Sequence, residues 1–99
     1  MPASSYWYLY IIRCSDGTLY TGVAQDIAAR LRAHAAGRGA RYTRGRGPFE
    51  LYAKRRCADK GAALSLEYAV KQLSRADKLR LSAPRALARF ARKHAEVHG

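Results

Sequence analysis

YWYLYIIRCSDGTLYTGV, residues 6–23, is the stretch that decides the fold. Residues 6–13 are rich in aromatic and β-branched side chains, which favour a β-strand. Apolar side chains occupy both alternating faces of this strand, so we expect it in the middle of a layered domain. Ser15-Asp16-Gly17 has the composition of a hairpin turn, and residues 18–23 then return as a second strand.

The rest of the chain predicts helices around one further strand. Asp26 is a suitable cap for a helix over residues 27–36 that Gly37 ends, with an apolar stripe of Ile27, Leu31 and Ala35. The glycine- and arginine-rich segment 37–48 is expected to be a mobile loop. After it we expect a strand at 49–57, a helix at 59–73, a short helix from Ser74 through Leu81, and a last helix that starts at Ser82 and Pro84.

These elements predict a single small α/β (α+β) domain over residues 1–99, with a three-stranded antiparallel sheet flanked by helices. Its core is expected to span about 6–81, followed by a basic helix over about 83–97. A length of 99 residues suits one domain with a modest core. Apolar residues form 48% of the chain, which excludes a disordered polymer despite the high charge.

The charge balance points to nucleic acid as the partner. Nineteen Lys and Arg against seven acids give a formal net charge of +12, and most of the cations are Arg. Arginine binds phosphate bidentately and stacks on bases, so an arginine-led excess favours nucleic-acid binding. The alternative is a solvated basic surface without a polyanionic partner.

The remaining composition predicts a cytoplasmic protein with no membrane partner. Cys14 and Cys57 form no metal-binding or CxxC pattern and are expected to be reduced thiols. The apolar run at residues 7–12 is too short to span a membrane, and no cationic segment precedes it as in a signal peptide.

Any hydrolytic site in this chain has few acids to use, because no two of the seven acids form a D-x-D or E-x-K pair. One divalent metal on a single carboxylate, with water and phosphate as further ligands, suits such a chain. Glu67 is the best candidate, since it lies at the edge of the core stripe beside Leu66. The alternative for Glu67 is an ion pair with Lys71 at i, i+4.

Four further side chains complete the candidate site. Tyr10 and Tyr20 come from neighbouring antiparallel strands and are expected to meet, one phenol acting on the attacking water and the other on phosphate. Arg30 and His34 share one helix face near the sheet, where Arg30 can stabilise charge on a phosphate. The alternatives are a surface arginine and a partly exposed helix histidine.

The layout resembles the GIY-YIG nuclease superfamily, in particular its short stand-alone bacterial branch. Tyr8-Leu9-Tyr10 and Tyr20-Thr21-Gly22 stand at the two motif triplets, and Arg30 and Glu67 match the family's arginine and glutamate, over about residues 6–75. The resemblance implies a Mg²⁺ (or Mn²⁺) site with Glu67 as the sole protein ligand, and a base role for His34 or support of one. Leu9 and Thr21 replace the family isoleucines, and the chain contains no Asn.

We therefore expect a divalent-metal-dependent endonuclease that hydrolyses phosphodiester bonds in DNA. The rivals are a non-catalytic basic protein associated with RNA or ribosomes, and an accessory nuclease subunit whose protein partner supplies specificity. Backbone contacts to nucleic acid are expected from the 38–48 loop and from the last helix, through Arg38, Arg41, Tyr42, Arg44, Arg46, Arg85, Arg89 and Arg92.

Overall fold

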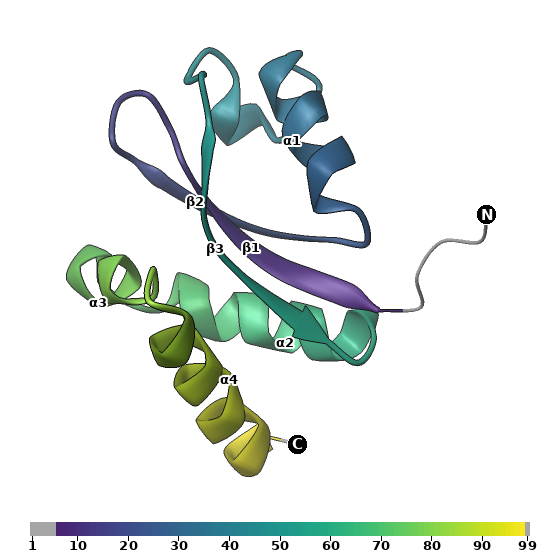
Figure 1. The fold of residues 1–99 in the computed structure, drawn as a ribbon, viewed down its shortest axis with the longest axis vertical. Helices are drawn as coiled ribbons and strands as arrows, with labels where there is room; N and C mark the ends of the chain where they lie inside the picture. Colours follow the sequence, from purple (N-terminus) through teal and green to yellow (C-terminus); the bar gives the residue numbers. More distant parts are fainter. Residues whose placement is uncertain (1–5, 99) are drawn as a thin grey trace.

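The computed structural model describes residues 6–98, apart from the side chains of Pro84, Val97 and His98 (Figure 1). Every predicted element is present, with ends that differ by one or two residues. Their order is β1 (Trp7–Arg13), β2 (Leu19–Ala24), α1 (Ile27–Ala35), a 3₁₀ turn (Arg41–Thr43), β3 (Glu50–Cys57), α2 (Lys60–Lys71), α3 (Arg75–Arg80) and α4 (Pro84–His98).

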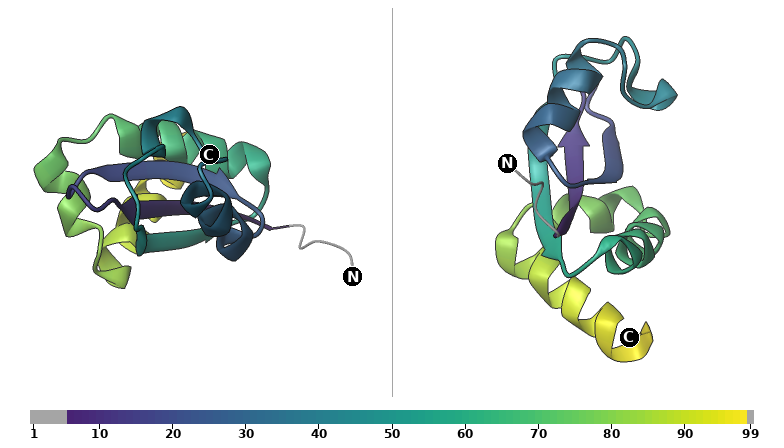
Figure 2. Two further views of the ribbon diagram at one scale, coloured as in Figure 1. Left: turned by 90° about the horizontal axis from the view of Figure 1, so that it is seen from above. Right: turned by 90° about the vertical axis from the view of Figure 1, so that its right-hand side faces the viewer.

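The three strands form one antiparallel sheet with β1 in the middle, in the order β2-β1-β3 (Figure 2). In this register Tyr10 lies opposite Gly22 on β2 and Lys54 on β3. The central position explains why β1 is apolar on both faces, since Leu9 and Ile11 on one face and Tyr10 and Ile12 on the other are all buried.

The helices cover the sheet on both sides (Figure 1). On one face Leu9 and Ile11 pack with Leu66 of α2 and Leu87 of α4. On the other face the even-numbered side chains of β1 pack against α1 and Phe49. The two tyrosine-bearing strands therefore present Tyr10 and Tyr20 to the side of the sheet that α1 covers.

Local sequence signals fix the ends of several elements as expected. The Asp26 carboxylate accepts a hydrogen bond from the Ala29 N–H at 3.0 Å and caps α1, and Asp59 caps α2 in the same way through Ala62 at 2.8 Å. Gly17 has φ of 84° in the β1–β2 turn, which is a conformation that glycine adopts without strain.

One position of the predicted α1 stripe is wrong. His34 is buried, whereas Ala35 is exposed. A helix turns by about 100° per residue, so residue i+7 lies roughly 20° from the direction of residue i and residue i+8 roughly 80° from it. The face of α1 that begins at Ile27 and Leu31 therefore continues to His34.

The segment 37–48 is not the featureless loop that its composition suggested. It contains the 3₁₀ turn, in which the Thr43 N–H donates to the Ala40 carbonyl at 3.1 Å. The Ser15 N–H donates to the Arg46 carbonyl at 2.8 Å, which ties the segment to the β1–β2 turn. A hydrogen bond to a distant part of the chain thus ties this segment to the rest of the fold.

Two further expectations concern the thiols and the membrane. Cys14 is buried, Cys57 is half-buried, and both thiols are free. Across residues 6–98 no helix has the length and apolar character needed to cross a membrane.

We predict that Leu87→Ala lowers the free energy of unfolding by about 2–5 kcal/mol, because Leu87 is 1% exposed and its truncation leaves a cavity in the core cluster. Urea denaturation measures the change. Leu64→Ala on α2 is the matched control, since Leu64 is 43% exposed and its truncation should change stability by no more than about 0.5 kcal/mol. Equal effects of the two substitutions would show that α4 does not belong to the core.

Candidate active site

The site is organised around a buried tyrosine and a buried histidine. Tyr10 on β1 is 2% exposed and His34 on α1 is 3% exposed. The Tyr10 hydroxyl lies 2.9 Å from His34 Nε2. Sequence reasoning proposed both residues for the site. The alternative that it left open, a partly exposed histidine on the helix, is wrong.

Thr43 fixes the direction of this hydrogen bond. Its Oγ1 donates to the Ala40 carbonyl at 2.9 Å, and it lies 2.7 Å from His34 Nδ1. Because the single hydroxyl proton of Thr43 is already used, Oγ1 accepts the proton of Nδ1. Neutral His34 then has a bare Nε2, which accepts the Tyr10 proton. The chain of donors runs from Tyr10 through His34 and Thr43 to Ala40.

Two glycines make room for this pair. A Cβ at Gly22 would lie 2.6 Å from the Tyr10 oxygen, and a Cβ at Gly39 would lie 2.6 Å from the His34 Cγ. Both distances are far below van der Waals contact, so only glycine fits. β2 runs on past Gly22 to Ala24, and the ring of Tyr10 approaches Gly22 closely.

Tyr20 joins the pair from β2. Its register partner is Ile12, so it lies diagonally across from Tyr10, with ring centroids 6.4 Å apart. The Tyr20 ring is also 5.4 Å from His34. Tyr42 stacks on Tyr20 at 5.9 Å and is 48% exposed, so it extends the aromatic surface toward solvent.

The expectation that Arg30 lies near the sheet with His34 is wrong, because Arg30 is exposed on α1. Its positive charge still influences the pKa values of both buried residues. Burial lowers the pKa of His34 from its usual value, and the positive charge of Arg30 lowers it further. His34 is therefore neutral at pH 7. Burial raises the pKa of Tyr10, as do Tyr20 and Glu67, while Arg30 opposes them. The Tyr10 phenol stays protonated and acts as a donor.

Glu67 on α2 is the carboxylate of the site. Its negative charge is the weakest of the four influences on the pKa of Tyr10, which it raises. The Glu67 side chain is 19% exposed and pairs with the Lys71 ammonium at 3.2 Å, so the ion pair considered from the sequence is present. Within residues 6–98 no three His, Cys, Asp or Glu side chains come together as a metal cluster. This donor set fits a hard cation held by one carboxylate, water and phosphate.

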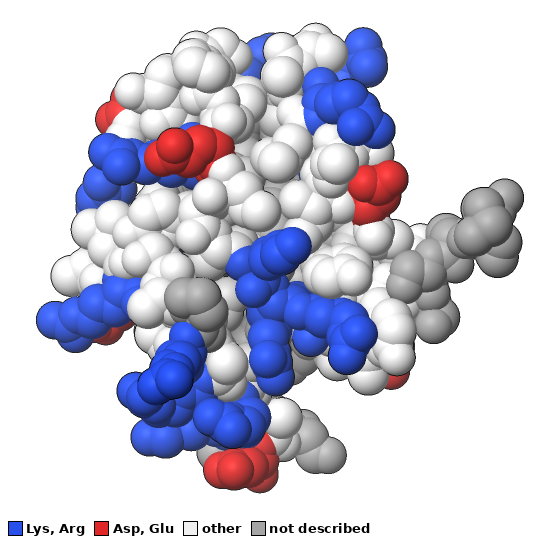
Figure 3. Space-filling model, in the orientation of Figure 1, with Lys and Arg blue, Asp and Glu red and all other residues white. Residues whose placement is uncertain are grey.

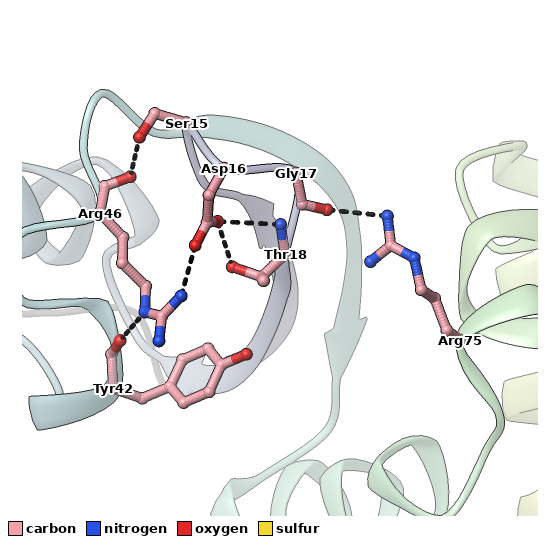
Figure 4. A network of polar contacts seen from close by, with 7 residues as sticks. All are labelled: Ser15, Asp16, Gly17, Thr18, Tyr42, Arg46 and Arg75. Atoms are coloured by element: carbon pink, nitrogen blue, oxygen red, sulfur yellow. Dashed lines mark hydrogen bonds and ion pairs between the residues drawn. The ribbon is translucent and has the colours of Figure 1, made fainter.

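The loop next to the site is held by an ion pair and several hydrogen bonds (Figure 4). Arg46 pairs with the Asp16 carboxylate, and its Nε donates to the Tyr42 carbonyl at 2.7 Å. Hydrogen bonds from Thr18 and the charge of Arg46 lower the pKa of Asp16. Arg46, which was expected to bind nucleic acid, thus carries structural contacts within the protein.

Other predicted nucleic-acid contacts point to solvent. Arg38, Arg41 and Arg44 are exposed around the 3₁₀ turn, and Arg85, Arg89 and Arg92 are exposed on α4. The face shown in Figure 3 carries its largest gathering of Lys and Arg over β3 and α4, below the level of the candidate site.

Sequence reasoning missed Thr43 and Gly39. Both belong to the segment that was read as a mobile loop, and each contacts His34 only because that segment folds back against α1. The available signal was Thr43 itself, a lone threonine next to Tyr42 in a run of Gly and Arg. A loop that only contacts phosphate through its cations does not need a threonine.

The chain is similar in sequence and in fold to known proteins. The GIY-YIG catalytic domain matches residues 6–80. The chain is 49% identical over 74 residues to a UPF0213 protein of Oceanobacillus iheyensis, covering 75% of this chain and 86% of that one. It is 46% identical over 80 residues to a UPF0213 protein of Aeromonas hydrophila, covering 81% of this chain and 59% of that one. The solution NMR structure of a UPF0213 protein from Bacillus halodurans, 42% identical, superposes with a TM-score of 0.53 over 88% of this chain and 93% of that one.

We predict that Gly39→Ala destabilises the protein by about 1–3 kcal/mol, because the added methyl overlaps the buried ring of His34. Urea denaturation at pH 7 measures the change. Gly61→Ala on α2 is the control, since its Cβ meets only Asp59 Oδ1 at 3.5 Å and its helical position favours alanine. A Gly39→Ala protein as stable as the wild type would contradict the packing of His34 against Gly39.

Proposed function

This chain belongs to the family of GIY-YIG catalytic domains, and on that premise we propose that it is a divalent-metal-dependent endonuclease that hydrolyses phosphodiester bonds in DNA. The observation that supports the proposal most is the directed hydrogen bond from Tyr10 to neutral His34. A protein that only binds nucleic acid has no need for a buried proton acceptor beside an arginine and a carboxylate.

In the proposed reaction the attacking water gives its proton to the Tyr10 oxygen while the Tyr10 proton passes to His34 Nε2. The phenol remains neutral throughout, which suits its raised pKa. His34 ends as an imidazolium whose Nδ1–H still donates to Thr43. The hydroxide adds to phosphorus as the P–O bond to the leaving strand breaks, and the alkoxide that departs takes a proton from solvent water. Removal of such a base typically costs 10²–10⁴-fold in rate.

The other groups of the site bind and polarise the phosphate. Arg30 is exposed and close enough to affect His34 and Tyr10, so its guanidinium is placed to stabilise charge on the scissile phosphate. Tyr20, between His34 and Tyr42, offers a hydroxyl to a phosphate oxygen. Arg38, Arg41 and Arg44 are proposed to contact the DNA backbone near the cut.

Glu67 is the residue that would hold the metal. When bound, Mg²⁺ or Mn²⁺ there would neutralise phosphate charge and lower the pKa of a coordinated water. Lys71 competes for the same carboxylate, and its 3.2 Å pair must open for a cation to bind. A surface pair of this kind is worth at most about 1 kcal/mol, which is a small barrier to metal binding.

We predict that Glu67→Gln reduces Mg²⁺-dependent DNA cleavage by about 10²-fold or more, while DNA binding measured in EDTA stays equal or becomes tighter. The amide keeps the shape of the side chain and removes the charge that binds metal and repels phosphate. Glu50→Gln, an exposed carboxylate at the start of β3, is the control and should cleave at the wild-type rate. Full activity of Glu67→Gln would refute the single-carboxylate metal site.

When the cleavage rate is measured against pH, we predict that the fall of the rate on the acid side has its midpoint below pH 6.5. The reason is that burial and the charge of Arg30 both lower the pKa of His34. Thr43→Val removes the acceptor for the imidazolium Nδ1–H, so it should lower the plateau rate by roughly 10-fold or more and move this midpoint to still lower pH. Thr43→Ser keeps the hydroxyl and should retain the wild-type profile. A Thr43→Val enzyme with an unchanged profile would mean that Thr43 only packs.

A further inference from the structure

A second cationic surface lies at the β3 edge of the sheet, on the other side of β1 from the strand that carries Tyr20. A groove of about 440 Å³ opens between β3 and α4. Four of its six lining residues are cations and none is an acid; it is lined by Lys54, Arg55, Arg56 and Arg85, together with Tyr8 and Ala88. Only Arg85 of these belonged to the surface expected from the sequence.

The register explains how the groove is built. Tyr8 on β1 lies opposite Arg56, and the next residue on the same face, Tyr10, lies opposite Lys54. Lys54 and Arg56 thus project from one face of β3, about 7 Å apart along the strand. Arg85 completes the groove from α4, which packs against β3.

None of the four groove cations is in an ion pair with a carboxylate of the described chain. The ion pairs in residues 6–98 join Arg46 to Asp16, Lys71 to Glu67 and Arg80 to Asp77. Four like charges in one groove repel one another and lower stability unless an anion neutralises them. Charged side chains on an edge strand also keep that strand from pairing with other strands. The cations of β3 itself are enough for this protection.

One of these side chains is already oriented. The Arg56 guanidinium lies 4.4 Å from the centre of the Tyr6 ring, which is 42% exposed. Stacking on an aromatic ring holds the planar guanidinium without using its N–H donors, so they stay available to phosphate oxygens. The half-buried ring of Tyr8 adds an apolar wall against which a sugar or base can pack.

We propose that this β3–α4 groove is a second binding site for the phosphate backbone of DNA, and that it holds a segment beyond the one being cut. The identity of the polyanion as DNA rests on the proposed function. Tyr20 lies on β2 and three of the four groove cations lie on β3, so two strand spacings, roughly 10 Å, separate these two edges of the sheet. A substrate that reaches both edges is held on either side of the central strand.

The test compares two double variants with equal loss of charge. Lys54→Gln/Arg56→Gln changes the groove, and Lys78→Gln/Arg80→Gln changes α3 outside it, so each takes the formal net charge from +12 to +10 (12 − 2). Affinity for a labelled DNA duplex is measured by fluorescence anisotropy at several salt concentrations in EDTA, where no metal-dependent cleavage occurs.

We expect the groove variant to bind DNA several-fold more weakly, with a salt slope shallower by about two, because each lost phosphate contact removes roughly 0.9 from the slope. The α3 variant should stay near the wild type in both its affinity for DNA and its salt slope. If both variants weaken equally, or if neither does, the proposal is wrong. Stronger competition by polyglutamate than by unlabelled DNA of equal charge would instead assign the groove to an acidic protein and overturn the proposal.

Arg85→Gln, which alters the α4 wall alone, repeats the test should the β3 variant fail to fold, and it should lower the slope by about one. Because binding is measured without cleavage, the result also separates two kinds of failure. If the protein does not cleave DNA but the groove variant still binds DNA more weakly, the nuclease proposal is wrong and the groove proposal stands. If the protein cleaves DNA but the groove variant binds as tightly as the wild type, the groove proposal is wrong and the nuclease proposal stands.

Discussion

The hydroxyl of Tyr10 is buried, and a buried hydroxyl without a partner costs about 1–3 kcal/mol. His34 Nε2 is the partner, but it can accept only while the ring proton sits on Nδ1. Thr43 keeps it there, because its own proton is committed to the Ala40 carbonyl. One carbonyl in a turn thus determines the tautomer of the histidine and the direction of the Tyr10 hydrogen bond. The stability of the α1 side of the sheet and the chemistry of the site depend on the same chain of donors.

That constraint gives the glycine-rich segment after α1 a structural role. The segment brings Thr43 to His34, leaves space at Gly39 for the ring, and is tied to the β1–β2 turn through Arg46 and Asp16. The cations of the molecule therefore divide into those that hold the fold, as Arg46 does, and those left for an anionic partner.

The fold was predictable from the sequence because its signals are local. Alternating apolar residues, a Ser-Asp-Gly turn, and caps such as Asp26 act within a few residues, and each is found where it was expected. The motif singled out Tyr10 as a candidate site residue. Thr43 was not singled out, because its contact with His34 joins segments that only the folded chain brings together. His34 was expected near the sheet and is buried there, but it was left out of the apolar stripe because an i, i+4, i+8 count passes over position i+7.

The central claim is that His34 is a neutral, Nδ1-protonated acceptor for the Tyr10 hydroxyl. Long-range ¹H–¹⁵N NMR correlation of the histidine rings at pH 7, with His34 assigned by its absence in His34→Gln, tests it most directly. The account predicts a protonated, pyrrole-like Nδ1 and an unprotonated, pyridine-like Nε2. An Nε2-protonated tautomer, or an imidazolium at this pH, would contradict it.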